Sequence, residues 1–179
     1  MVSFSARAHC TSFVVASSHL KLSAHIMMMP TVWTRNPVPV GQSRRRRRVL
    51  AVLNTRSILI LDGSTGTKVA EIATRSTSYA GIAFRPGDRE LWASETSRNG
   101  PDSILIAKIS ELGMPGETSR IGLNGHPLPT GIAFSPDGKL AYVAFSRSNT
   151  LAIIDADTLE LRKEINVGMA PFGVIVANG

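Results

Sequence analysis

Gly81-Ile82-Ala83-Phe84-Arg85-Pro86 returns fifty residues later as Gly131-Ile132-Ala133-Phe134-Ser135-Pro136, and this repeated stretch decides the fold. Two further echoes fix the length of the repeat. Ser57-Ile58-Leu59-Ile60 recurs 46 positions on as Ser103-Ile104-Leu105-Ile106, and Ile60-Leu61-Asp62 recurs 93 positions on as Ile153-Ile154-Asp155. Short apolar runs that recur every ~40 to 50 residues are typical of a β-propeller or a related repeat array. A repeat of this kind predicts an architecture and leaves the ligand open.

The turn chemistry is most explicit in the third copy of the repeat. Its first strand is predicted over 131–135 and ends at Pro136-Asp137-Gly138, which is expected to be a turn. Proline presets φ, aspartate bonds back to the backbone, and glycine takes a positive φ without steric cost. Further strands are predicted over 140–145, 150–154 and 159–167, with an aspartate turn at Asp155 before the last of them.

The last of these strands alternates in character, as expected for an outer strand with one solvated face. One face is predicted to carry Leu159, Leu161, Lys163 and Ile165, and the other face Glu160, Arg162, Glu164 and Asn166. No segment of the repeat region shows a sustained 3.6-residue apolar period. The repeat region is therefore predicted to contain strands only.

The other copies follow the same order with small changes. The second copy is predicted to have strands over 81–85, 90–95, 103–109 and 118–123, with longer loops at 97–102 and 112–117. The first copy keeps three strands, over 49–54, 57–61 and 68–74, and a fourth copy begins with a strand over 171–176. The predicted fold class is all-β, an incomplete β-propeller of about three four-stranded antiparallel blades. The blades are placed at about 48–75, 79–124 and 129–168, with the start of a further blade at 170–179.

The net charge of +7 belongs to the N-terminal leader, because residues 1–48 carry +8 and residues 49–179 carry −1. A nearly neutral repeat region has no field to steer a polyanion. The run Arg44 to Arg48 lacks interleaved aromatics, so no nucleic-acid partner is expected. No run reaches the ~18 apolar residues of a membrane span.

The leader, residues 1–47, is predicted to be disordered or to lie outside the working protein. At the 93-residue offset, Val38 to Arg45 should match the strand and turn at 131–138, and the match collapses there. An acid-free, arginine- and serine-bearing segment also fits an organelle transit peptide or a degenerate export signal. Phe13-Val14-Val15-Ala16 is too short for the apolar region of a convincing signal peptide.

No catalytic, cofactor or metal site is predicted. The only cysteine, Cys10, lies in the leader, which excludes an intrachain disulfide and a cysteine-based zinc site. His126 is interpreted as a solvated loop residue, with a ligand at a channel entrance as the alternative. Asp62, Asp155 and Asp137 are interpreted as turn formers, together with Pro136 and Gly138, with metal, ligand or acid–base contacts as the alternative. Trp92 and Tyr142 are expected to pack between blades.

Several of these stretches resemble the bacterial YVTN-type β-propeller repeat. They are Gly131-Ile-Ala-Phe-Ser-Pro-Asp-Gly-Lys-Leu-Ala-Tyr-Val143, Ser148-Asn149-Thr150-Leu-Ala-Ile-Ile-Asp155, and Ile165-Asn-Val-Gly168 with Pro171 and Gly173. The tetrad itself reads Tyr142-Val143-Ala144-Phe145, so its second half departs from the family pattern. The resemblance implies four antiparallel strands in each blade. It also implies kinship with exported or surface-layer repeat proteins, with lactonase-like propellers, or with propellers fused ahead of a phosphoesterase, and hence an extracytoplasmic location.

An arc of about three blades leaves apolar faces and strand edges uncovered, because propellers close rings of about four to eight blades. We therefore expect either a fragment of a longer protein or part of an oligomeric ring, with self-association through the open edges. Two functions follow. The first is a non-enzymatic scaffold that binds a protein or a small ligand. The second is the N-terminal propeller part of a lactonase-like or metal-dependent phosphoesterase-fused enzyme whose catalytic residues lie elsewhere.

Overall fold

The computed structural model is built from β-strands, with no helix in the residues that it describes. The described ranges are 48–75, 81–87, 89–97, 100–125 and 127–177. The predictions for the leader 1–47 and for His126 lie outside these ranges. The all-β prediction is confirmed.

Within these ranges, eleven strands form three separate antiparallel sheets, in which each strand pairs with its neighbour in sequence. The first sheet comprises β1 (Val49–Leu53), β2 (Ser57–Asp62) and β3 (Lys68–Ala73). The second sheet comprises β4 (Ile82–Phe84), β5 (Glu90–Glu95), β6 (Ser103–Ile109) and β7 (Pro115–Gly122). The third sheet comprises β8 (Pro129–Phe134), β9 (Leu140–Phe145), β10 (Thr150–Asp155) and β11 (Leu161–Asn166).

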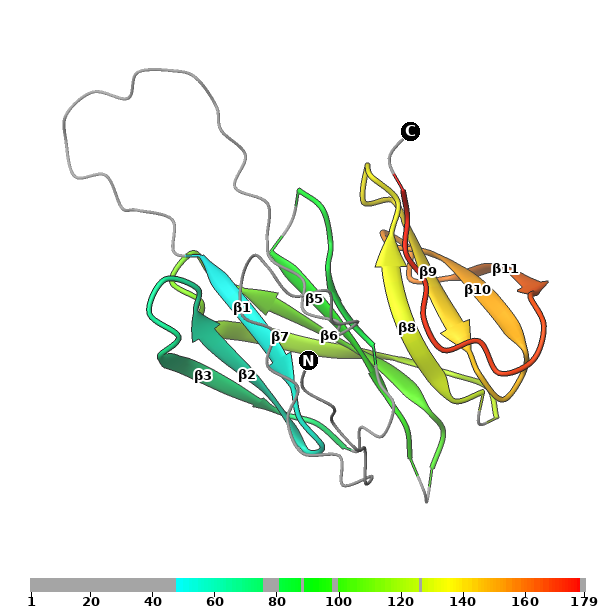
Figure 1. Ribbon diagram of the computed structural model, residues 1–179, viewed down its shortest axis with the longest axis horizontal. Helices are drawn as coiled ribbons and strands as arrows, with labels where there is room; N and C mark the ends of the chain where they lie inside the picture. Colours follow the sequence, from blue (N-terminus) through cyan, green and yellow to red (C-terminus); the bar gives the residue numbers. More distant parts are fainter. Residues whose placement is uncertain (1–47, 76–80, 88, 98–99, 126, 178–179) are drawn as a thin grey trace, which may run out of the picture.

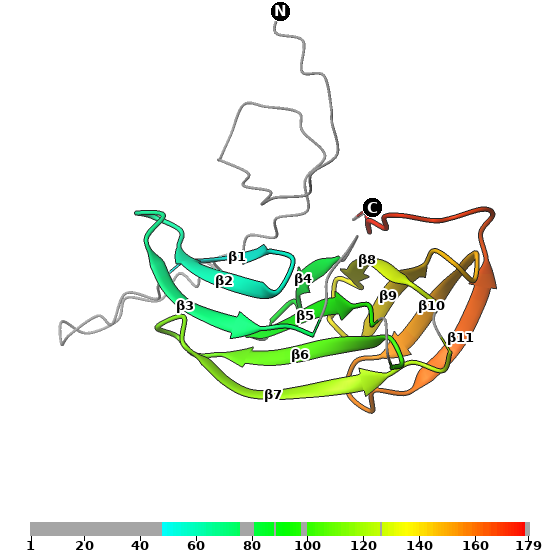
Figure 2. The same cartoon turned by 90° about the horizontal axis from the view of Figure 1, so that it is seen from below.

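The three sheets stand side by side in chain order (Figure 1). Viewed from below, they form an arc, with β4 and β8 toward the concave side and β3, β7 and β11 along the convex side (Figure 2). Each copy of the repeat thus forms one sheet. The first copy has three strands and the next two have four each, as the sequence predicts.

Two apolar clusters fill the junctions between neighbouring sheets. The first joins Ile58 and Ile60 of the first sheet to Leu91 and Leu105 of the second. In the second, Trp92 is fully buried and meets Phe134 of the third sheet edge-to-face, with ring centroids 5.3 Å apart. Alternation along β5 produces both contacts, because successive side chains of a strand point to opposite faces. Trp92 therefore packs between two sheets as predicted, whereas Tyr142 lies half-buried on the far face of the third sheet.

Glycines let the innermost strands approach one another at backbone distance. A Cβ atom on Gly81 would lie 2.2 Å from the carbonyl oxygen of Thr130, and one on Gly131 would lie 2.7 Å from the Cα atom of Gly173. Hydrogen bonds bridge the same places. The Ser94 hydroxyl donates to the Thr130 carbonyl at 2.7 Å, and the Thr130 hydroxyl donates to the Pro171 carbonyl at 3.1 Å. The repeated glycine is thus required by close packing near the concave side of the arc.

Three details differ from the sequence-based expectations. β7 begins at Pro115, inside the predicted loop 112–117, because a tight turn at Gly113 (φ 83°) lets Ile109 pair with Pro115. The predicted alternation over 159–167 is wrong at its start. A bulge pairs Leu161 with Ile154 and Lys163 with Ile153, so these two side chains lie on opposite faces. The strand predicted over 171–176 does not form, because no described strand supplies its ladder partner.

Candidate binding grooves between the second and third sheets

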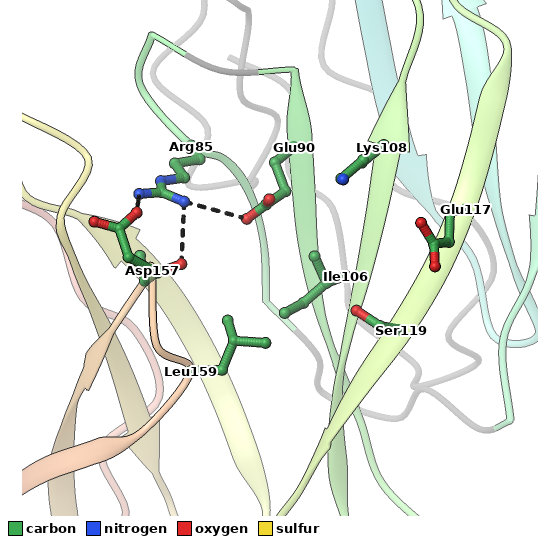
Figure 3. Close-up of a pocket in the computed structure, with 9 residues that line it drawn as sticks. Arg85, Glu90, Ile106, Lys108, Glu117, Ser119, Asp157 and Leu159 are labelled. Carbon is green, nitrogen blue, oxygen red and sulfur yellow. Dashed lines mark hydrogen bonds and ion pairs between the residues drawn. The ribbon is translucent and has the colours of Figure 1, made fainter.

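Arg85 ties the second sheet to the third. Its guanidinium donates to the carbonyl oxygens of Gly138 at 2.7 Å and Ala156 at 3.0 Å, and it pairs with the carboxylate of Asp157. A Glu90 carboxylate oxygen lies 3.8 Å from Nη1 (Figure 3). The Arg85 side chain is only 13% exposed, so its two bonds to carbonyl oxygens are partly buried, whereas the Asp157 side chain is 64% exposed. Arg85 therefore acts as a latch between two turns of the third sheet and the end of β4.

A groove of about 330 Å³ lies beside this latch (Figure 3). Its wall in the second sheet includes Ile106 and Lys108 of β6 and Glu117 and Ser119 of β7. Its other wall is the turn after β10, with Asp157 and Leu159. The side chains of Lys108 and Glu117 make no hydrogen bond or ion pair within the described part of the chain. The groove therefore presents an ammonium group and a carboxylate that are available to a ligand.

A second groove of about 230 Å³ continues along the same junction, and Leu159 lines both. Leu159 has a positive φ of 63°, which directs the chain out of the turn and into β11. The lining of this second groove includes the apolar side chains of Ile121, Leu123, Phe145, Ile154 and Leu161, together with Asn124, Ser148 and Glu164. The junction therefore offers two adjoining grooves, each lined by both apolar and polar groups.

A buried carboxylate lies at the other end of β5. Glu95 is 1% exposed and accepts hydrogen bonds from Arg120 Nε at 2.8 Å, from the Ser103 hydroxyl at 2.9 Å and from the Arg75 backbone N–H at 3.0 Å. Burial raises the pKa of Glu95, but the hydrogen bonds outweigh it and hold that pKa below its ordinary value. All of these groups are used within the chain, which makes the cluster a structural ion pair.

The predicted turn residues occupy loops at the ends of strands. Asp62 Oδ1 accepts the backbone N–H groups of Ser64 at 2.8 Å and Thr65 at 3.1 Å. Asp155 Oδ1 does the same for Asp157 at 2.8 Å and Thr158 at 2.9 Å. These two bonds, with the Arg162 guanidinium, lower the pKa of Asp155 to about 2.

The third predicted turn, Pro136-Asp137-Gly138, contacts the Arg85 side chain. Asp137 Oδ1 accepts the Ser135 hydroxyl at 2.6 Å and the Lys139 N–H at 3.1 Å, and these bonds lower the pKa of Asp137. Pro136 is exposed, and Gly138 has a φ of 70°. Gly138 also accepts the Arg85 hydrogen bond, so this turn contributes to the latch.

The sequence reasoning missed Arg85, Lys108 and Glu117. A signal for Arg85 was present, because it is the one position at which the hexamer differs between its two copies, with Ser135 as its equivalent. No signal marked Lys108 or Glu117, since isolated charges on alternating strand positions are ordinary surface residues.

Among the described residues, no group of three or more His, Cys, Asp or Glu side chains is arranged to hold a metal ion. The same part of the chain contains no helix that is long and apolar enough to cross a membrane.

Comparison with solved structures identifies the arc. The chain is similar to the hydrazine synthase of Kuenenia stuttgartiensis, with 15% identity, a TM-score of 0.60, and coverage of 72% of this chain and 49% of that one. It is similar to a candidate 6-phosphogluconolactonase from Bacteroides fragilis, with 22% identity, a TM-score of 0.57, and coverage of 70% and 37%. It is also similar to the Swd1 β-propeller domain of Myceliophteria thermophila, with 19% identity, a TM-score of 0.52, and coverage of 70% and 39%.

The fold is an incomplete β-propeller. At these identities the likeness shows the fold alone. It confirms the β-propeller architecture that was predicted from the repeat and its turns. The propeller arc spans less than half the length of each of these three structures. No family model and no curated protein matches the sequence.

Proposed function

We propose that this β-propeller arc is a non-catalytic scaffold of the bacterial YVTN repeat type, which binds an extended protein segment or a small ligand between its second and third blades. The observation that carries the proposal is the groove beside Arg85. The side chains of Lys108 and Glu117 line this groove and have no partner among the described residues, while the neighbouring Arg85 is fully engaged in holding the blades.

The chemistry of the groove favours a peptide-like ligand. A peptide unit offers a carbonyl acceptor, which suits the Lys108 ammonium, and an N–H donor, which suits the Glu117 carboxylate. The apolar side chains of the second groove beyond Leu159 would then contact a hydrophobic side chain of the ligand. Ligand sites commonly combine an apolar lining with a few polar groups that fix orientation. The resemblance to exported repeat proteins supports an extracytoplasmic location for this interaction.

The proposal is tested by selecting binders from a displayed random-peptide library and measuring their affinity by calorimetry. The variant Lys108→Ala/Glu117→Ala should weaken binding of the selected peptides at least ~10-fold, which corresponds to about 1.4 kcal/mol. A matched control is Lys139→Ala/Glu160→Ala, which removes the same charges from exposed positions outside the groove. Failure to select any peptide, or equal affinity of selected peptides for both variants, would contradict the proposal.

A second candidate is the propeller part of a lactonase-like or phosphoesterase-fused enzyme. The likeness to the candidate 6-phosphogluconolactonase favours it, although at 22% identity this likeness is one of fold. The purified chain is assayed for ring opening of a phosphorylated sugar lactone and, with added divalent metal, for hydrolysis of a phosphate ester. A rate above the spontaneous one that resists further purification would support this candidate against the scaffold.

A further inference from the structure

The last tight turn of each sheet contains a residue in the left-handed backbone region. These residues come two positions before the outermost strand, and they are Gly66 (φ 71°), Gly113 (φ 83°) and Leu159 (φ 63°). The turns of the first and third sheets have the same construction. The Gly66 N–H donates to the Asp62 carbonyl at 2.7 Å, and the Leu159 N–H donates to the Asp155 carbonyl at 2.9 Å. In the third sheet, leucine thus occupies a position that the other two sheets give to glycine.

This backbone conformation does not by itself favour leucine. Glycine adopts a positive φ freely, whereas in a bulky residue the same conformation is an outlier that carries strain. The turn does not require leucine either, because the Asp62 carboxylate accepts two backbone N–H groups in the first sheet as Asp155 does in the third. What leucine adds to the third sheet is therefore its side chain. Strained residues of this kind cluster at binding and active sites, where the surrounding structure holds them in place.

The Leu159 side chain lies where the two grooves meet. Leu159 is the residue that both linings share, and it is half-buried, with Ile106 on the opposite wall of the first groove (Figure 3). The equivalent glycines stand in different surroundings. A Cβ atom on Gly66 would meet no described atom within 4 Å, and one on Gly113 would already lie 3.4 Å from side-chain atoms of the first sheet. Leucine is thus found where the turn borders an open groove.

Building on the proposed function, we infer that Leu159 determines the specificity of this site. It contacts a large apolar side chain of the bound segment, at the point where the segment passes from the first groove to the second. Lys108 and Glu117 lie in the first groove and orient a peptide unit there. Leu159 is the apolar surface that leads from this pair into the second groove. An apolar contact strengthens with the area that it buries. The site should therefore prefer leucine, methionine or phenylalanine in the segment over alanine or serine.

The strain at position 159 is measured with two variants that both remove the leucine side chain. Leu159→Ala keeps a residue with a Cβ atom in the left-handed region, whereas Leu159→Gly relieves the strain. Leu159→Gly should therefore have a Tm about 3 °C above that of Leu159→Ala, although glycine ordinarily destabilises a fold relative to alanine. The circular dichroism of both variants should match the wild type. A Tm of Leu159→Gly at or below that of Leu159→Ala would show that no strain is held there and would overturn the inference.

Specificity is measured by calorimetry with the peptides selected on the wild-type chain. Leu159→Gly should weaken their binding at least ~10-fold, while Leu159→Met, which keeps an apolar side chain of similar volume, should bind within ~3-fold of the wild type. Replacing the large apolar residue of the peptide by alanine should cost ~10-fold on the wild type and less than ~2-fold on Leu159→Gly, because the two side chains contact each other. Leu112→Gly is the matched control. Leu112 is exposed in the equivalent turn of the second sheet and lines neither groove, so its removal should leave the affinity unchanged.

The role of Leu159 and the proposed function fail in different ways. Selected peptides that bind the wild type and Leu159→Gly with equal affinity would overturn the role of Leu159 and would leave the groove as a binding site. Equal losses from the alanine-substituted peptide on the wild type and on Leu159→Gly would also overturn it, since the two side chains would then act independently. Failure to select any peptide would remove the proposed function and the role of Leu159 with it.

Discussion

Replacing Arg85 with methionine tests whether the latch between the second and third sheets stabilises the arc. The substitution keeps an unbranched apolar stem and removes the guanidinium, so the carbonyls of Gly138 and Ala156 lose their donors. Hydrogen bonds to a charged group contribute about 1.5 to 3 kcal/mol each. Two such bonds give about 3 to 6 kcal/mol. We expect about 3 kcal/mol, because the latch borders a groove through which water can reach the freed carbonyls.

The measurement is equilibrium unfolding in urea at one fixed protein concentration, since association alters apparent stability. Trp92 is buried beside the latch, and a Trp33→Phe background leaves it as the only tryptophan. A loss of about 3 kcal/mol corresponds to a fall in Tm of about 10 °C for a domain of this size. Arg85→Lys should recover less than half, because a single ammonium cannot reproduce the planar fork.

Asp157→Asn is the matched control for charge. The Asp157 side chain is 64% exposed, and ion pairs in such positions contribute at most about 1 kcal/mol. If Arg85→Met unfolds within about 0.5 kcal/mol of the wild type, or if Asp157→Asn costs as much as Arg85→Met, then the carbonyl bonds are not what holds the two sheets.

Three further predictions concern the remaining polar and close-packed positions. Arg120→Met should lower the free energy of unfolding in urea by about 2 to 3 kcal/mol, because it leaves the buried Glu95 carboxylate without its cation. Adding Glu95→Gln to the same chain should restore part of this loss. No recovery in the double variant would contradict the assignment of Glu95 and Arg120 as an ion pair. The pKa of Asp155 is depressed to about 2, so its stabilisation is complete above about pH 4 and is lost as pH falls toward 2. Asp155→Asn should flatten the fall of Tm over that window, and parallel curves for variant and wild type would refute this. Gly81→Ala should destabilise the fold by at least about 3 kcal/mol, because its Cβ would meet a backbone oxygen at 2.2 Å. Gly122→Ala is the control and should be nearly neutral, since its Cβ would meet nothing within 4 Å. Equal Tm values for the two variants would disprove the close contact at Gly81.

The strands were predictable because the signals that define them are local. The predicted ranges 90–95, 103–109 and 140–145 coincide with β5, β6 and β9, where apolar and β-branched residues lie between explicit turns. Errors arose where pairing, and not sequence character, sets a boundary. β7 extends back to Pro115 because β6 is long enough to pair with it, and 171–176 lacks a partner despite an apolar sequence.

The latch and the groove were not predictable, because they depend on contacts between copies of the repeat. Arg85 reaches Gly138 and Ala156 across 53 and 71 positions, and no spacing rule within one copy joins such residues. The Glu95–Arg120 pair lies within one sheet, but it joins nonadjacent strands across β6 and has no equivalent in the third copy. Long-range polar contacts of this kind follow from how sheets stack, which the repeat pattern specifies only for the apolar residues.

The glycines at the inner ends of the blades have a consequence for how such rings diversify. Because the backbones of successive inner strands already touch at Gly81 and Gly131, the wedge angle between neighbouring blades is set by main-chain thickness. Larger or smaller side chains farther from the ring axis would change how strongly neighbouring blades pack, but they would hardly change the angle between the blades. A lineage built on this unit would therefore change ring size mainly by gaining or losing whole repeats.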